Sequence, residues 1–197
     1  MTETWAIILA AGESVRMQSN KMLLHFHGKT IIETVIDQAM QPDIDKILVV
    51  LGAYRDDMLP LISRLPVVHC YNPEYKTGML SSVQCGFRNL SASVGAAIIF
   101  LGDQPTVPGE VAGLLIREYR KSGKGIVMPA FRGKRGHPVL IDMKFSEAIA
   151  KISNDGGLHT LMREYPGDIL ELDVEIPEIL KDMDTPQDYL ALTNQHN

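Results

Sequence analysis

The stretch Trp5-Ala6-Ile7-Ile8-Leu9-Ala10-Ala11-Gly12-Glu13-Ser14-Val15-Arg16-Met17, followed by Lys21, carries the strongest signal in this sequence. Its apolar part, Trp5–Leu9, predicts a strand buried on both faces of a sheet. Small residues at positions 10 to 12 let the backbone of the next loop approach a ligand closely. Arg16 and Lys21 supply positive charge that suits a phosphate chain. We therefore expect a phosphate-binding loop; the alternative is a small-residue turn with solvated cations.

Short apolar runs like this one recur along the chain and alternate with amphipathic stretches. The expected strands are Trp5–Leu9, Lys46–Val50, Val67–Tyr71, Ala96–Leu101, Ile126–Met128, Pro138–Ile141 and Ile169–Leu172. Each run is continuous rather than alternating between apolar and polar residues, which is typical of strands buried on both faces. The alternation predicts a three-layer α/β/α sandwich with a mostly parallel sheet. Phe131–Pro138 is a polar, glycine-rich connection without a helix, so an antiparallel excursion is expected near residues 126–141.

Capping residues mark where helices begin and end. Thr30–Glu33 and Thr185–Asp188 both match the capping-box pattern, in which two side chains satisfy exposed backbone N–H groups. The first predicts a helix to about residue 40. Pro108–Lys121 has apolar residues at helical spacing and ends near Gly123, where glycine adopts a left-handed cap easily. Gly28–Thr30 resembles the end of a P-loop but lacks its first glycine, so a turn plus helix cap is expected.

Length, composition and charge narrow the class of protein. The 197 residues, 45% apolar and 22% charged, predict a single folded domain over 1–197. A formal charge of -5 disfavours nucleic acid as a partner, so any phosphate-bearing ligand is gripped locally. Cys70 and Cys85 are too few for a secreted disulfide framework. Met1–Thr4 lacks a basic region and Trp5–Leu9 is too short for a membrane span, so a cytoplasmic location is expected.

Three aspartates are candidates for holding a metal ion. Asp103 follows the expected strand Ala96–Leu101, so its carboxylate is predicted at the same sheet edge as the first loop. Magnesium prefers one or two carboxylates together with phosphate oxygens and water. Asp182 and Asp184 alternate on an extended segment and so share a face, which makes them further candidates. The alternatives are a turn before Pro105 for Asp103 and helix capping for the other two.

The first loop with Lys21 resembles the signature of the MobA-like nucleotidyltransferases, a family that activates sugars and pterins with nucleoside triphosphates. Within the family, the molybdenum cofactor cytidylyltransferases are the most similar. The likeness extends through Gly78-Met79-Leu80-Ser81-Ser82-Val83, Leu101-Gly102-Asp103-Gln104-Pro105, Arg135-Gly136-His137-Pro138-Val139 and Asp182-Met183-Asp184-Thr185-Pro186. One departure is Gln18, where the family usually has glycine. We call residues 9–17 the signature loop.

The resemblance implies a nucleotide-diphospho-sugar transferase-like fold and assigns roles to residues. The implied nucleotide-binding residues are Leu9, Ala10, Ala11, Gly12, Gly78, Ser81, Ser82 and Gly102. The first four would wrap the triphosphate, while the region from Gly78 to Ser82 would contact the base and ribose. Helix capping explains Ser81 and Ser82 equally well. His137 would reach the acceptor substrate; the alternative is a hairpin histidine without a ligand. His25 and His27 are expected on the surface.

The predicted function is magnesium-dependent transfer of a nucleoside monophosphate, CMP from CTP, to the terminal phosphate of a molybdopterin-type cofactor, with release of pyrophosphate. Arg16, Lys21 and Asp103 are the expected catalytic residues. Ala11, where guanylyl enzymes tend to carry glycine, favours CTP. The alternatives are a guanylyltransferase, a sugar-phosphate nucleotidyltransferase, or a noncatalytic partner that delivers cofactor to a molybdenum hydroxylase. An oxidoreductase is disfavoured because no glycine-rich dinucleotide loop follows the first strand.

Overall fold

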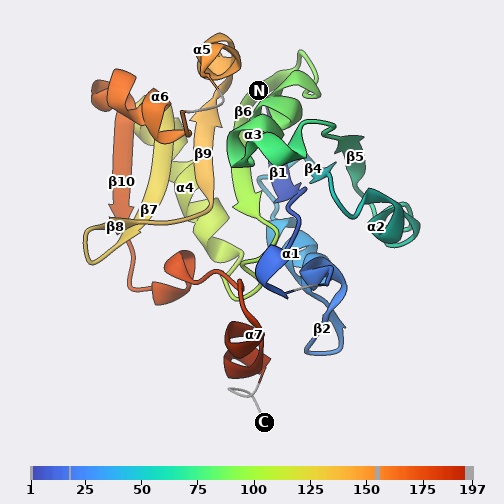
Figure 1. The fold of residues 1–197 in the computed structure, drawn as a ribbon. Helices are drawn as coiled ribbons and strands as arrows, with labels where there is room; N and C mark the ends of the chain where they lie inside the picture. Colours follow the sequence, from blue (N-terminus) through green and yellow to red (C-terminus); the bar gives the residue numbers. More distant parts are fainter. Residues whose placement is uncertain (1, 18, 154–155, 194–197) are drawn as a thin grey trace.

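A mixed sheet of eight strands forms the middle layer of the structure, and helices cover both of its faces (Figure 1). The computed structural model describes residues 2–17, 19–153 and 156–193. Gln18, where the family usually has glycine, lies outside the described residues. The strand order is β10-β7-β9-β6-β1-β4-β5, and β8 pairs with β7 beside this path.

The strands of the main sheet are β1 (Glu3–Ala10), β4 (Lys46–Leu51), β5 (Val68–Tyr71), β6 (Val94–Leu101), β7 (Ile126–Phe131), β8 (Lys134–Arg135), β9 (Val139–Asp142) and β10 (Ile169–Asp173). A separate hairpin consists of β2 (His25–Phe26) and β3 (Lys29–Thr30). The helices are α1 (Ile31–Ala39), α2 (Arg55–Ile62), α3 (Met79–Arg88), α4 (Glu110–Ser122), α5 (Ser146–Lys151), α6 (His159–Glu164) and α7 (Pro186–Thr193).

Parallel pairing brings the carboxyl ends of four strands to one edge of the sheet. In the register of β1 with its neighbours, Leu9 lies opposite Val50 of β4 and Leu101 of β6. On the far side of β4, Leu51 lies opposite Tyr71 of β5. The loops that follow these strands therefore gather at the same edge, which is where open α/β sheets bind ligands.

Side chains of the central strand β1 point alternately into two apolar cores. Ala6 and Ile8 pack with α1, α2 and α4, whereas Trp5 and Ile7 pack with α3, α5 and α6 on the other face. Both isoleucines are fully buried. This explains why the run is apolar at every position, and it confirms the three-layer sandwich expected from the sequence.

The antiparallel excursion is also confirmed. β9 lies between β6 and β7 and pairs antiparallel with both of them. The short strand β8 turns back and pairs antiparallel with the end of β7. β9 thus fills a central place in the sheet without a crossover helix.

The expectation that every strand is buried on both faces is wrong for the two edge strands. In β5, Val68 and Tyr71 are each 45% exposed, and β10 consists of half-buried and exposed residues only. Both strands lie at the rim of the sheet, where they have one neighbouring strand and less cover from the helices. A short apolar run therefore predicts a strand more reliably than it predicts how deeply the strand is buried.

Both predicted capping boxes are present. Thr30 N–H donates to Glu33 Oε2 at 2.8 Å, while the Thr30 side chain accepts from the Glu33 N–H. Thr185 N–H donates to Asp188 Oδ2 at 2.8 Å, and Asp188 N–H donates back to Thr185 Oγ1. Helix α4 ends at Gly123, which has a left-handed φ of 68°. Across the part of the chain that the structure describes, every helix is too short or too polar to cross a bilayer.

The hairpin of β2 and β3 accounts for the P-loop-like residues. Gly28 forms its turn with a φ of 86°, and Thr30 is the N-cap of α1. His25 and His27 are exposed on this hairpin, as predicted.

Candidate active site

A cleft with a volume of about 440 Å³ lies at the sheet edge where the carboxyl ends of β1 and β6 meet. Its walls come from four parts of the chain: the signature loop with Lys21, the segment that enters α3, the end of β6, and the residues before α7. The lining residues are Leu9, Ala11, Gly12, Ser14, Val15, Arg16, Lys21, Met22, Tyr75, Gly78, Met79, Ser82, Leu101, Asp103 and Asp184.

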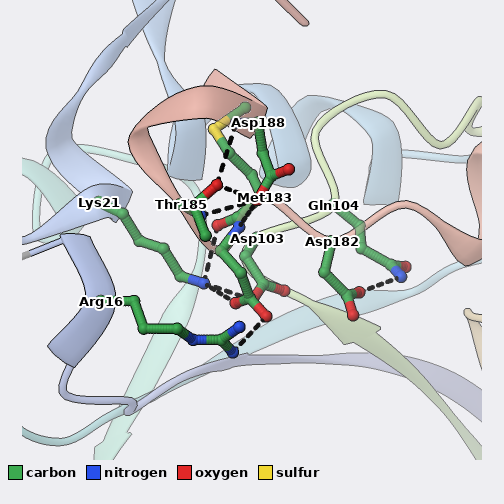
Figure 2. A network of polar contacts seen from close by, with 9 residues as sticks. Arg16, Lys21, Asp103, Gln104, Asp182, Met183, Thr185 and Asp188 are labelled. Carbon is green, nitrogen blue, oxygen red and sulfur yellow. Dashed lines mark hydrogen bonds and ion pairs between the residues drawn. The ribbon is translucent and has the colours of Figure 1, made fainter. Parts of the chain in front are cut away.

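Lys21 joins two acidic side chains in this cleft (Figure 2). Its Nζ donates to Asp103 Oδ2 at 2.6 Å, to Asp184 Oδ1 at 2.9 Å and to the carbonyl oxygen of Met183 at 2.9 Å. An ammonium group has three hydrogens, so all of them are used. Arg16 Nη2 donates to the other carboxylate oxygen, Asp184 Oδ2, at 2.6 Å.

The two cations differ in how accessible they are to a ligand. The Lys21 side chain is 8% exposed, whereas that of Arg16 is 68% exposed. Among the described residues, Asp184 is the only hydrogen-bond partner of the Arg16 guanidinium, which has five N–H donors. Arg16 can therefore bind phosphate oxygens directly. Lys21 must release one of its three acceptors, Asp103, Asp184 or the Met183 carbonyl, before it can do so.

Burial and charge act against each other on Lys21 and Asp184. Burial lowers the pKa of Lys21, but Asp103 and Asp184 outweigh it and raise that pKa above its usual value. Burial also raises the pKa of Asp184, yet Lys21 and Arg16 hold it below its usual value. Lys21 and Asp184 are therefore both charged at neutral pH.

The segment 176–184, which we call the strap, carries Asp184 to the cleft. Met183 N–H donates to the carbonyl oxygen of Asp103 at 3.0 Å, so the strap is pinned to the end of β6. Asp182 was expected to share a face with Asp184, but it accepts a hydrogen bond from Gln104 Nε2 at 2.8 Å instead (Figure 2). Burial raises the pKa of Asp182. Asp184 lines the cleft and Asp182 does not.

Ser81 and Ser82 lie inside α3 and do not cap it, because the helix starts at Met79 and its N-cap is Gly78. The capping alternative for these two serines is therefore wrong. They are 1% and 4% exposed, and each accepts a hydrogen bond from the side chain of Asn72. Ser82 and Gly78 line the cleft, whereas Ser81 lies behind them.

Of the other residues that the resemblance implicates, Ala10, Gly102 and His137 do not line the cleft. Ala10 is buried in the core on the α1 side. Gly102 N–H donates to the carbonyl oxygen of Leu9 at 3.0 Å, so it links β6 to the start of the signature loop. Burial lowers the pKa of His137 to about 4, so its imidazole is neutral at pH 7.

Two residues that shape the cleft were missed from the sequence. Asn72 directly follows β5, and it is fully buried although it is polar. Gly52 directly follows β4, where a Cβ would lie 2.3 Å from the carbonyl oxygen of Ala11. Each stands at the carboxyl end of a strand beside the signature loop. A polar asparagine or a glycine without a side chain, placed directly after a buried strand, is the sequence feature that could have identified these two residues.

We expect Gly52→Ala to displace the signature loop, because its methyl group has no room beside the Ala11 carbonyl. Overpacking of this kind costs about 1–3 kcal/mol in free energy of unfolding. The melting temperature and the affinity for the nucleotide should both fall. Gly113→Ala in α4 is the matched control, since a Cβ there meets nothing within 4 Å. Equal melting temperatures for the two variants would contradict this close approach.

A parallel sheet edge with a small-residue loop, two cations and two carboxylates defines a nucleotide-handling α/β protein. The family is shown by comparison with known proteins: the model of the MobA-like NTP transferase domain matches residues 6–169. The chain belongs to this family and is a nucleotidyltransferase.

Individual relatives agree over almost the full length of the chain. The molybdenum cofactor cytidylyltransferase of Escherichia coli is 31% identical, with 96% of this chain and 95% of that protein covered. The nicotine blue oxidoreductase of Paenarthrobacter nicotinovorans is 25% identical, with 94% of each covered. A solved structure, Rv0371c of Mycobacterium tuberculosis in complex with manganese, has a TM-score of 0.80 at 21% identity, with 98% of this chain and 100% of that chain covered. This last likeness bears on the fold alone.

Proposed function

We propose that this protein transfers a nucleoside monophosphate from a nucleoside triphosphate to a phosphate-bearing acceptor and releases pyrophosphate. One observation carries the proposal. Arg16, Lys21, Asp103 and Asp184 converge in a single cleft, beside a signature loop whose small residues leave its backbone accessible. Such a site binds a polyphosphate and offers carboxylates to the cation that accompanies it.

The protein's own residues act by charge and position. An acceptor phosphate is already ionised at neutral pH, so no general base is required. Arg16, exposed at the mouth of the cleft, binds the phosphate chain and neutralises charge that grows on the departing pyrophosphate. Lys21 holds Asp103 and Asp184 together, and the field of its charge favours the same leaving group. Positioning and electrostatics supply the rate enhancement.

A divalent cation, Mg²⁺, fits the residues present. Asp103 and Asp184 already share a cation in this structure, the ammonium group of Lys21, and every ligand of that cation is an oxygen atom. Oxygen donors with one or two carboxylates are what Mg²⁺ prefers, the remainder coming from phosphates and water. We propose that Asp103 and Asp184 hold the ion. When bound, it polarises the phosphoryl group and offsets developing charge.

We propose CTP as the nucleotide and a molybdopterin-type cofactor as the acceptor. The E. coli relative carries both halves of this activity in its name. Ala11 supports the first half physically, because it lines the cleft and brings a methyl group where guanylyl enzymes tend to have glycine. The acceptor half rests on the resemblance, chiefly through Gly136–Val139 and Gly78-Met79. A molybdenum hydroxylase would then receive the product.

The proposal is tested by pyrophosphate release. Purified protein is incubated with Mg²⁺, each of the four nucleoside triphosphates in turn, and a molybdopterin-type acceptor. We expect release that requires both the acceptor and Mg²⁺. Nucleotide binding without any turnover would instead favour a noncatalytic delivery partner. A nicotinamide absorbance change without pyrophosphate would favour oxidoreductase chemistry, which one relative has in its name.

CTP is expected to bind more tightly than GTP. A single methyl group contributes about 1–3 kcal/mol to discrimination, so we expect a preference on the order of tenfold rather than exclusion. Competition calorimetry with both nucleotides in Mg²⁺ measures this ratio. Ala11→Gly should narrow it. Tighter binding of GTP by the unmodified protein would place it with the guanylyl enzymes and refute the role given to Ala11.

A further inference from the structure

Asn72 is a buried residue that connects the end of β5 to the first turn of α3. It is fully buried, and its backbone N–H donates to the carbonyl oxygen of Leu51 at 2.8 Å. Leu51 ends β4, and Ala53, just beyond it, donates its own N–H to the carbonyl oxygen of Ala11 in the signature loop at 3.1 Å. Asn72 is therefore held in a fixed relation to the loop on the opposite wall of the cleft.

The orientation of the Asn72 amide follows from its partners. Its Oδ1 accepts the backbone N–H of Glu74 at 3.0 Å, and only the oxygen end of the amide can do this. The nitrogen end consequently faces α3. Nδ2 has two hydrogens, and it donates one to Ser81 Oγ at 2.9 Å and the other to Ser82 Oγ at 3.0 Å.

The two serine hydroxyls are left in different states. Ser81 passes its own hydrogen to backbone carbonyls, those of Gly78 at 2.8 Å and Glu74 at 3.0 Å. Ser82 accepts from Asn72, and among the described residues its hydroxyl has no protein acceptor. Ser82 also lines the cleft, whereas Ser81 does not. The hydrogen of the Ser82 hydroxyl is thus available to a ligand.

We infer that Asn72 is a positioning residue that sets the Ser82 hydroxyl as a hydrogen-bond donor to the bound nucleotide. By occupying a lone pair of the Ser82 oxygen, Asn72 turns the hydrogen toward the cleft, where an acceptor atom of the ribose or base takes it. The inference rests on the proposed function, because the ligand is the nucleotide. Beyond that function, the inference specifies that Ser82 donates the hydrogen bond and that the buried Asn72 orients it.

Asn72→Asp is the sharpest test, because it keeps the shape and the bond from Glu74, and its ionised form, selected by assaying at a pH above the pKa of the new carboxyl group, can no longer donate. A carboxylate would accept the Ser82 hydrogen and withdraw it from the ligand. The affinity for CTP with Mg²⁺, measured by calorimetry, should fall about tenfold or more in Asn72→Asp and about threefold to tenfold in Ser82→Ala. KM should rise while kcat changes little, since the bond serves binding in ground and transition states alike.

A double-mutant cycle separates this role from a general effect of the new charge. In the Ser82→Ala background, Asn72→Asp should weaken binding of CTP by less than about threefold, because the Ser82 hydroxyl through which Asn72 acts on the ligand is absent. Equal weakening in both backgrounds would overturn the inference. If Asn72→Asp does not fold, Asn72→Ala is carried through the same cycle.

Asn89→Asp is the matched control. Asn89 lies at the other end of α3, where its side chain donates to the carbonyl oxygen of Cys85 at 2.8 Å. Its substitution should leave the affinity for CTP within about twofold, well below one hydrogen bond. If the unmodified protein binds no nucleoside triphosphate, the proposed function fails and this inference fails with it. If it binds CTP and Asn72→Asp binds equally well, only the inference fails.

Discussion

Asp103→Asn is expected to fold like the unmodified protein and to lose activity by a factor on the order of a hundred to a thousand. The substitution keeps the size of the side chain and leaves the bond from Met183 N–H to the Asp103 carbonyl in place. It removes a negative charge that faces the cleft and is needed to hold a cation beside the phosphates. Pyrophosphate release at saturating Mg²⁺ and nucleotide measures the loss, and circular dichroism melting measures the fold.

Asp37→Asn is the control for this variant. Asp37 also forms an ion pair with a lysine, Lys29, but both side chains are about half exposed and lie away from the cleft. Exposed pairs contribute little to stability, so turnover and melting should be unchanged. Full magnesium-dependent turnover by Asp103→Asn would remove Asp103 from the active site.

Lys21→Ala is expected to lower kcat and raise KM for the nucleotide together, with kcat/KM reduced by about a hundredfold or more. The loss of a phosphate-binding charge is one cause of this effect, and the structure indicates a second. Without the ammonium group, the carboxylates of Asp103 and Asp184 face each other with Arg16 alone to balance them. Their repulsion should also lower the melting temperature, and added Mg²⁺ should restore part of it.

Lys29→Ala is the corresponding control, since it removes a lysine from an exposed pair. It should leave kinetics and melting as they are. Steady-state kinetics of Lys21→Ala that match those of the unmodified protein would mean that the signature loop is a structural turn. A melting temperature that falls in Lys21→Ala and does not respond to Mg²⁺ would argue against a shared cation site at Asp103 and Asp184.

The strands could be predicted because each has a local cause. Trp5–Leu9 is apolar at every position because β1 faces a core on both sides, and the same pattern located β4 and β6. Capping boxes located the starts of α1 and α7 for an equally local reason, since their partners are three residues apart. The connection after β7 lacked a helical pattern, which was enough to predict an antiparallel strand.

The features of the site that could not be predicted from the sequence depend on contacts between distant segments. Asp182 and Asp184 alternate on the chain, but Asp182 accepts from Gln104 whereas Asp184 accepts from Lys21 and Arg16. Asn72 looks like an ordinary residue before a proline, because its role comes from serines on a helix that follows. The crowding at Gly52 comes from a loop that precedes it by a whole helix and a hairpin. Sequence patterns report local structure, so contacts between distant segments become visible only in the three-dimensional structure.

The strap has a consequence for how the protein is made. Residues 176–184 follow every strand of the sheet in chain order, yet they deliver Asp184 to Lys21 near the beginning of the chain. During synthesis on a ribosome, Lys21 therefore emerges long before the carboxylate of Asp184 that it holds. Ile179 and Met183 of the strap are fully buried in the core beside α1 and α4. The segment that completes the charge balance of the cleft thus also completes this core, which couples the folding of this enzyme to the assembly of its site.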